Sequence, residues 1–174
     1  LMALGLQKGD KVAVLLENSI EIIELYLATA KTGVVIVPIN FRLVGREVAF
    51  IVNNSDAKAL VVDAEFVPVV EEIRGDLPGI APEHIIVVGT ATPVFQSYDE
   101  LIAAGTEQEP QVAVAPRDTW ILIYTSGTTG KPKGVVRSHE SHIAFYLINA
   151  NHFGFRPHDN CMNVMTQCHI KTTF

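Results

Sequence analysis

Short runs of β-branched and aliphatic residues alternate along this chain with longer segments of helical character, and this alternation restricts the folds that the chain can adopt. Strands are predicted over residues 11–16, 34–37, 58–62, 84–88, 119–124, 134–138 and 161–165. Helices are predicted over residues 18–33, 44–55, 65–74, 97–105 and 139–155. Strands that alternate with helices are typical of α/β proteins. We therefore predict an α/β fold with a mostly parallel sheet flanked by helices.

The segment 18–33 carries the clearest helix signals. Asn18 is expected to cap its first turn, with Glu21 three residues later as in a capping box. Gly33 is expected to end the helix, because glycine readily adopts the left-handed conformation that follows a last turn. The apolar stripe predicted to face the core consists of Ile20, Ile23, Leu27 and Ala30.

Composition and charge argue against several classes of protein. The formal net charge of -6 disfavours a nucleic-acid binder, which usually carries a basic face. The sequence contains no apolar run of about eighteen residues, so no transmembrane segment is predicted. Two cysteines are too few for a disulfide framework, and a reduced, cytoplasmic protein is the expectation. The first residues lack the pattern of a signal peptide.

The stretch YTSGTTGKPKG, residues 124–134, has the composition of a phosphate-binding loop. Its glycines allow backbone N–H groups to approach an anion closely. Its hydroxyl groups add donors, and oxygens of this type also bind Mg²⁺. Lys131 and Lys133 supply positive charge. The loop is therefore predicted to hold a polyphosphate. On composition alone, an ordinary flexible Gly/Ser/Thr connection is the alternative.

This stretch differs from the Walker A loop of P-loop kinases and ATPases. Walker A requires Ser or Thr after its Gly-Lys pair and opens a helix, whereas Pro132 follows Lys131 here. The next residues, 134–138, favour a strand. We therefore predict that the loop joins two strands as a hairpin, and we disfavour a P-loop enzyme.

The longer string YTSGTTGKPKGVV resembles the signature of the adenylate-forming enzymes, which include acyl-CoA synthetases, luciferases and the adenylation domains of peptide synthetases. Residues 5–63 resemble the segments that precede this signature, and residues 163–174 resemble the segment usually written Met-Pro-Leu-aromatic-His. The resemblance covers essentially the whole chain and implies that residues 1–174 form the N-terminal portion of the AMP-binding domain. The adenine and ribose contacts, the Mg²⁺-binding Glu and the C-terminal domain with its catalytic Lys are expected after Phe174.

The resemblance also implies roles for individual residues. The residues expected to contact the phosphates of ATP are Thr125, Ser126, Gly127, Thr128, Thr129, Gly130, Lys131 and Lys133. Thr125 is expected near Mg²⁺. Lys133 is the favoured catalytic lysine, while Lys131 is either a phosphate contact or a solvated charge. His169 is expected to act beside the adenylate and the acyl pocket, the alternative being a buried histidine bonded to the backbone.

Some residues depart from the family pattern. Thr166 and Gln167 replace the usual Pro-Leu before Cys168, which affects the expected edge of the acyl pocket. Ser141 stands where the family usually has Asn. His139 is therefore expected to start and cap the helix that follows it rather than to serve the site.

Two other uses of the cysteines are disfavoured. A metal site built from Cys161, Cys168 and His169 matches no recognised zinc spacing. A nucleophile pair of Cys168 and His169 is also disfavoured, because neighbours on a strand point to opposite faces.

The resemblance implies ATP-dependent activation of a carboxylic acid through an acyl-adenylate, followed by thioester formation with CoA. The expected partners are therefore the acid, ATP and CoA, with Mg²⁺ as cofactor; the acid could be fatty, aryl or other. An amino-acid-adenylating domain is the main rival within the superfamily. For the chain alone, a catalytically silent nucleotide-binding fragment is the alternative. A homo-oligomer formed through an exposed sheet edge is also left open.

Overall fold

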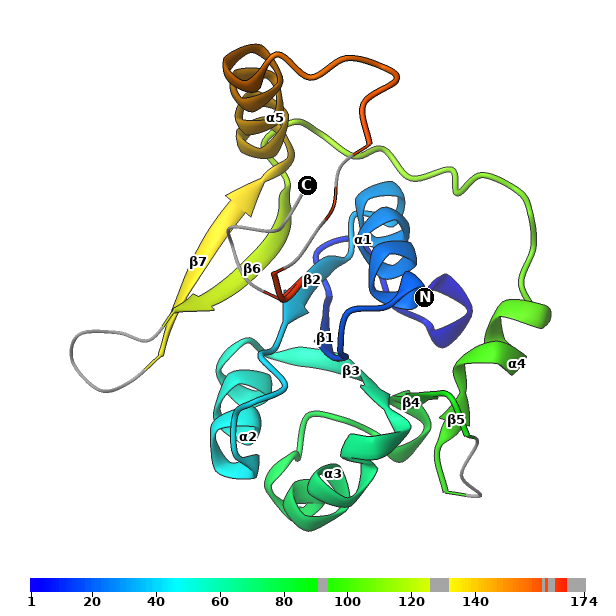
Figure 1. Cartoon of the computed structure of the whole chain (residues 1–174). Coiled ribbons are helices and arrows are strands. Elements are labelled where there is room, and N and C mark those ends of the chain that lie inside the picture. Colours follow the sequence, from blue (N-terminus) through cyan, green and yellow to red (C-terminus); the bar gives the residue numbers. More distant parts are fainter. Residues whose placement is uncertain (91–93, 126–131, 161, 163–164, 169–174) are drawn as a thin grey trace.

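A seven-stranded sheet runs through the molecule and separates two layers of helices (Figure 1). The computed structural model describes residues 1–90, 94–125, 132–160, 162 and 165–168. The strands are β1 (Lys11–Leu15), β2 (Val35–Pro38), β3 (Ala57–Asp63), β4 (Ile85–Val88), β5 (Gln96–Ser97), β6 (Thr119–Thr125) and β7 (Lys133–Ser138). The helices are α1 (Ile20–Thr32), α2 (Gly45–Asn54), α3 (Val67–Ile73), α4 (Tyr98–Ala103) and α5 (His139–Phe153). Single 3-10 turns lie at Met2–Leu4, Ala64–Phe66, Arg74–Asp76 and Pro82–His84.

The strand order is β5-β4-β3-β1-β2-β6-β7. All neighbouring strands are parallel except β6 and β7, which pair antiparallel. The prediction of an α/β fold with a mostly parallel sheet is therefore confirmed.

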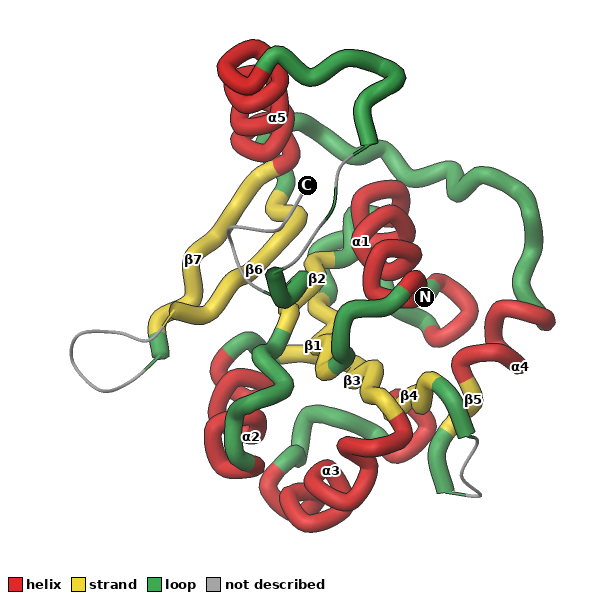
Figure 2. The backbone as a smooth tube through the Cα atoms, viewed as in Figure 1, coloured by secondary structure: helices red, strands yellow, loops and turns green. Residues whose placement is uncertain are grey.

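Helices cover both faces of this sheet, as the tube in Figure 2 shows. Successive residues of β1 alternate between the two cores. Val12 and Val14 pack with residues of α1 and α4, whereas Ala13 and Leu15 pack with residues of α2 and α3. Because both faces are buried at the centre of the sheet, strands β1 to β4 consist mostly of consecutive apolar residues. This is why these strands can be recognised in the sequence although apolar and polar residues do not alternate along them.

The order of the strands places a topological switch at β1. The connection from β1 through α1 leads to β2 on one side, and the connection from β2 through α2 returns past β1 to β3 on the other. Right-handed crossovers that run in opposite directions put their helices on opposite faces. In sheets of this kind, ligands bind beyond the carboxyl ends of the strands at such a switch. The carboxyl ends of β1, β2, β3 and β6 share that edge.

Two details predicted for α1 are wrong. Its N-cap is Ser19, whose hydroxyl accepts a hydrogen bond from the N–H of Ile22 at 3.4 Å, and not Asn18. Ile20 and Leu27 of the predicted stripe are 71% and 58% exposed. The buried residues of α1 are instead Ile22, Leu25, Tyr26, Thr29 and Thr32.

Two threonines explain why the wrong face of α1 was predicted. The hydroxyl of Thr29 donates to the carbonyl of Leu25 at 2.8 Å, and that of Thr32 donates to the carbonyl of Ala28 at 2.8 Å. Their polar groups are satisfied within the helix, so these residues can be buried although their type suggests exposure. Gly33 does end the helix, with φ of 70°, as predicted.

Other elements differ from prediction in smaller ways. β5 has two residues, too few for a sequence pattern to reveal. The predicted helix 65–74 divides into a 3-10 turn and α3, which carries a proline in its first turn. α5 starts at His139 as predicted, but its cap is the side chain of Ser138. Of the strand predicted over 161–165, only residues 162 and 165 are described, and neither is in a strand.

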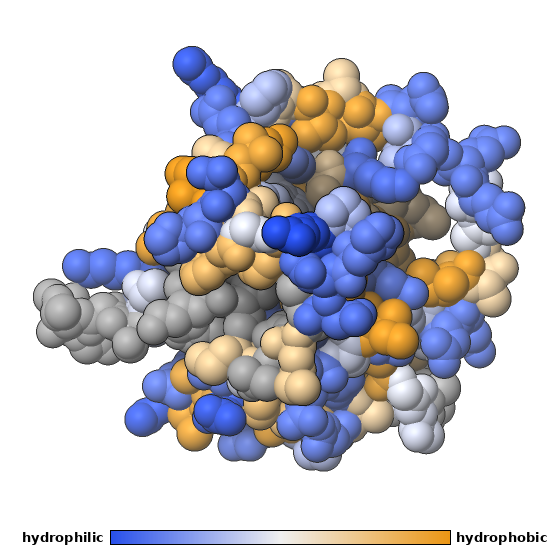
Figure 3. All heavy atoms as spheres, turned by 45° about the horizontal axis from the view of Figure 1, so that its top comes forward, coloured by the Kyte–Doolittle hydropathy of each residue, from blue (hydrophilic) through white to orange (hydrophobic). Residues whose placement is uncertain are grey.

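α5 exposes many apolar side chains. Leu147, Ile148 and Phe153 are 66%, 68% and 65% exposed, and Val136 of the adjoining edge strand β7 is 62% exposed. In Figure 3, where the α5 end of the molecule is turned forward, apolar side chains stand among hydrophilic ones on the surface. Within the described ranges, no helix is both long enough and apolar enough to cross a bilayer.

Candidate functional site

The predicted phosphate loop joins β6 to β7 as a hairpin. The two strands pair in antiparallel register, with Thr125 opposite Lys133 and Tyr124 opposite Gly134. The predicted phosphate contacts Ser126, Gly127, Thr128, Thr129, Gly130 and Lys131 lie outside the described residues. A strand begins at Lys133, so the arrangement lacks the helix that follows a Walker A loop. The hairpin prediction is therefore confirmed, and the P-loop alternative loses its structural basis.

Thr125 and Lys133 lie together at the base of this loop, on the carboxyl edge of the sheet. Both residues are exposed. Within the part of the chain that the structure describes, Lys133 forms no salt bridge. No carboxylate among the described residues therefore pairs with its ammonium group.

The hairpin is attached to the rest of the fold through Tyr124. The Tyr124 hydroxyl donates to Asn54 Oδ1 at 2.7 Å, at the end of α2. Burial raises the pKa of Tyr124, so its phenol stays a protonated donor. A Cβ added at Gly134 would lie 3.0 Å from Leu122 Cδ1 and 3.3 Å from Tyr124 Cζ. Glycine at this position therefore leaves room for the Tyr124 ring across the hairpin.

A second segment of the site, residues 165–168, lies against the start of α1. The Asn18 amide donates to the carbonyl of Met165 at 2.8 Å and accepts from the N–H of Gln167 at 2.7 Å. The N–H of Ser19 donates to Gln167 Oε1 at 3.2 Å. The hydroxyl of Tyr26 donates to the carbonyl of Gln167 at 3.0 Å. His169, the predicted catalytic histidine, lies just outside the described residues.

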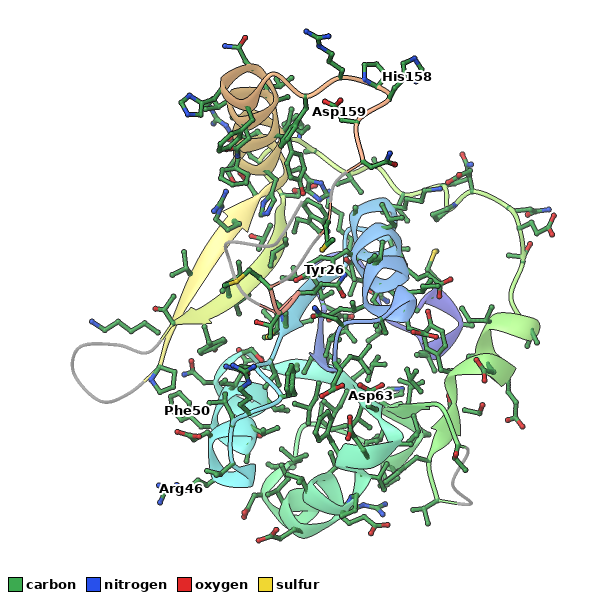
Figure 4. All side chains as sticks on the ribbon, in the orientation of Figure 1. Tyr26, Arg46, Phe50, Asp63, His158 and Asp159 are labelled. Atoms are coloured by element: carbon green, nitrogen blue, oxygen red, sulfur yellow. The ribbon has the colours of Figure 1, made fainter. Side chains whose placement is uncertain are left out.

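Tyr26 of α1, labelled in Figure 4, connects this segment to α1 through its hydroxyl. Burial, Cys168 and Tyr146 all raise the pKa of Tyr26, so its hydroxyl remains a donor. Burial also raises the pKa of the Cys168 thiol, which receives a hydrogen bond from the backbone of Phe41 in the loop after β2. The Cys168 thiol is half-buried and stays protonated at neutral pH, and a protonated thiol is a poor nucleophile.

An aromatic cluster lies behind this segment, around Trp120 of β6. The Trp120 ring stacks on His139 with centroids 5.5 Å apart and meets the edge of His142 at 4.8 Å. The indole N–H of Trp120 donates to the carbonyl of Tyr26 at 3.1 Å. His142 is only 2% exposed, and burial, followed by the charge of Arg137, lowers its pKa to about 4. The cluster therefore connects β6 and α5 to α1. Its buried histidine, His142, is neutral at pH 7.

One acidic side chain also lies at the carboxyl edge of the sheet. Asp63, labelled in Figure 4 at the end of β3, accepts a hydrogen bond from the N–H of Glu17 at 2.6 Å. Burial raises the pKa of Asp63. Over the described part of the chain, no group of three or more His, Cys, Asp or Glu side chains is placed to hold a metal ion.

Sequence reasoning missed three parts of this arrangement. Nothing in the sequence pairs Asn54 with Tyr124, because the two residues belong to distant elements. The contacts of Asn18 were hidden by its position next to a helix start, where Asn usually caps. The burial of His142 has one sequence signal, since it lies one helical turn after His139 on the same side of the predicted helix.

Comparison with known proteins agrees with this geometry. The pattern that defines the family described as AMP-binding enzyme matches residues 1–173. The chain belongs to this family of adenylate-forming enzymes.

Its relatives include ligases that are named for different acids. The chain is 42% identical over 143 residues to the long-chain-fatty-acid–CoA ligase FadD13 of Mycobacterium tuberculosis, covering 81% of this chain and 27% of that protein. It is 36% identical over 172 residues to a crotonobetaine/carnitine–CoA ligase of Salmonella paratyphi B, covering 97% of this chain and 33% of that protein. The chain thus spans about a third or less of the length of these relatives.

Solved structures show the same fold. The crystal structure of a long-chain-fatty-acid–CoA ligase (FadD1) from Archaeoglobus fulgidus matches with a TM-score of 0.88 at 29% identity, over 99% of this chain and 33% of that one. The inhibitor-bound N-terminal domain of FACL13 from Mycobacterium tuberculosis matches with a TM-score of 0.83 at 34% identity, over 99% of this chain and 42% of that one.

Proposed function

We propose that the protein carrying this chain is an acid:CoA ligase that consumes ATP and forms AMP. In the first half-reaction, a carboxylate oxygen of the acid attacks the α-phosphorus of ATP. The bond from that phosphorus to the bridging oxygen breaks, and pyrophosphate leaves with the electron pair. In the second, the CoA thiolate attacks the acyl carbon and AMP leaves. The observation that carries the proposal is the β6–β7 hairpin, in which Thr125 and Lys133 face each other at the base of the loop.

Within this proposal Lys133 stabilises the charge that develops on the leaving pyrophosphate. Phosphoryl and nucleotidyl transfer depend mainly on positioning and electrostatics, so an ammonium group that pairs with no carboxylate of the described residues, at the base of a donor-rich loop, suits the reaction. The loop residues 126–131 add N–H and hydroxyl donors. His169 acts beside the acyl carboxylate. These last residues enter the proposal through their places in the family signature.

Mg²⁺ fits the chemistry of the described residues at one position. The hydroxyl oxygen of Thr125 is a ligand type that this hard cation accepts. When bound, the ion would neutralise part of the charge on the phosphates. The remaining oxygen ligands are proposed to come from the phosphates, from water and from residues other than those described.

The proposal is tested by measuring pyrophosphate release from ATP by the full-length protein. The panel of acids should include long-chain fatty, hydroxybenzoic and carnitine-like acids, since CoA ligases for these acids are related to the chain. We expect release to depend on one class of acid, and acyl-CoA to appear when CoA is added. Release that never depends on an added acid would refute the proposal. Accumulation of an aminoacyl-adenylate without turnover on CoA would instead favour an amino-acid-adenylating domain.

A further inference from the structure

Asn18 uses both ends of its amide on a single distant segment. Its Nδ2 donates to the carbonyl of Met165 at 2.8 Å, and its Oδ1 accepts from the N–H of Gln167 at 2.7 Å. These two backbone groups belong to residues two apart, so the amide pairs with the segment as a neighbouring strand would. Aspartate lacks the donor for this pairing, and serine lacks the span.

Gln167 completes the attachment from the opposite side. Its Oε1 accepts from the N–H of Ser19, a backbone donor at the helix start that has no partner within the helix. Its carbonyl accepts from the hydroxyl of Tyr26. Gln167 is 7% exposed and Tyr26 is 6% exposed. The four hydrogen bonds therefore include buried groups, for which the loss of a partner is costly.

The attachment depends on the residue type at position 167. A leucine there would have no acceptor for the N–H of Ser19. The glutamine in this chain supplies that acceptor, and Asn18 and Tyr26 hold the backbone on either side of it. The residues held in this way immediately precede Cys168 and His169.

We propose that Asn18 and Gln167 are positioning residues that hold segment 165–168 at the carboxyl edge of the sheet, and that acid activation depends on this attachment. The inference rests on the proposed function for its link to acid activation. The attachment itself is independent of that function. Its loss should lower kcat for acid-dependent pyrophosphate release while leaving the KM for ATP within about twofold, because the phosphate hairpin is attached separately through Tyr124.

The experiment uses the full-length protein with Asn18→Asp, which keeps the size of the side chain and removes its donor. We expect kcat to fall about ten- to a hundredfold, the scale of a small misplacement at a reacting centre. Alkylation of the half-buried Cys168 by iodoacetamide, followed by mass spectrometry of its peptide, should become several-fold faster. Asn53→Asp is the matched control, since the Asn53 amide also donates to a backbone carbonyl, at 2.7 Å, but on α2. This control should change neither measurement.

Gln167→Leu provides a second, milder variant in case Asn18→Asp does not fold, as judged by its thermal midpoint. It removes only the acceptor for Ser19, so it should change both measurements in the same direction by a smaller factor. The inference is overturned if folded variants alkylate Cys168 at the wild-type rate. It is also overturned if alkylation accelerates while kcat stays unchanged. If the wild-type protein releases no acid-dependent pyrophosphate, the proposed function fails, and the alkylation rates still decide whether the attachment exists.

Discussion

Lowering the pH should destabilise the chain through His142. This side chain is 2% exposed and packs against the rings of Trp120 and Tyr146, and burial together with Arg137 lowers its pKa to about 4. The ordinary value of about 6.5 applies in the unfolded chain. Because the folded state binds the proton less readily, the stability that His142 contributes is present above pH 6.5 and is lost as the pH falls toward 4. At pH 4.5 the loss amounts to about 2 kcal/mol, at roughly 1.4 kcal/mol per pKa unit.

The measurement is the free energy of unfolding in urea at pH 7 and pH 4.5, for the wild-type chain and for His142→Phe. Phenylalanine keeps an aromatic ring in the cluster and removes the titration. The difference between the two pH values should therefore be about 2 kcal/mol smaller in the variant. His152→Phe, at an exposed position of the same helix, is the matched control and should follow the wild-type curve. Equal pH dependence in wild-type and His142→Phe proteins would refute the reasoning.

Three substitutions test the hairpin, and one experiment tests the chain by itself. Tyr124→Phe removes the 2.7 Å hydrogen bond to Asn54 and should lower the free energy of unfolding by about 1 kcal/mol, measured by urea denaturation. Gly134→Val should lower the thermal midpoint and the rate of pyrophosphate release together, since its Cβ would meet Leu122 and Tyr124; an unchanged midpoint would contradict this. Lys133→Ala should reduce acid-dependent pyrophosphate release by at least about tenfold in a folded protein, with Lys133→Arg retaining more activity. The isolated chain should bind ATP weakly in calorimetry and form no acyl-adenylate, so a stoichiometric acyl-adenylate would refute the idea that it is catalytically silent.

The central strands β1 to β4 were predictable because they are buried on both faces. Residues Val12 to Leu15 of β1, for example, are all apolar, and this property follows directly from helices that cover both faces of the sheet. The buried face of α1 was not predictable in the same way. Thr29 and Thr32 are polar residues, but they can be buried because each hydroxyl donates a hydrogen bond to a carbonyl of its own helix.

The candidate site was also predictable only in part. The hairpin could be predicted from its own residues, since Pro132 excludes Walker A geometry and the next residues favour a strand. The partners of Asn18 could not, because its bonds reach Met165 and Gln167, which are remote in sequence. Local propensity describes how a residue meets its neighbours along the chain. It carries no information on which distant backbone groups will need a donor.

The pairing of β2 with β6 also has a consequence for the order of folding. Ile36 of β2 pairs with Ile121 of β6, and the chain between them forms the strands β3, β4 and β5 and the helices α2, α3 and α4. Closing so long a loop is slow, so we expect the edge of β2 to remain open until the rest of the sheet has formed. The unpaired N–H and C=O groups of such an open edge can form hydrogen bonds with a strand of another chain. The strand that covers this edge, β6, leads directly into the predicted phosphate loop, so the edge of β2 is covered in the same step that forms the hairpin.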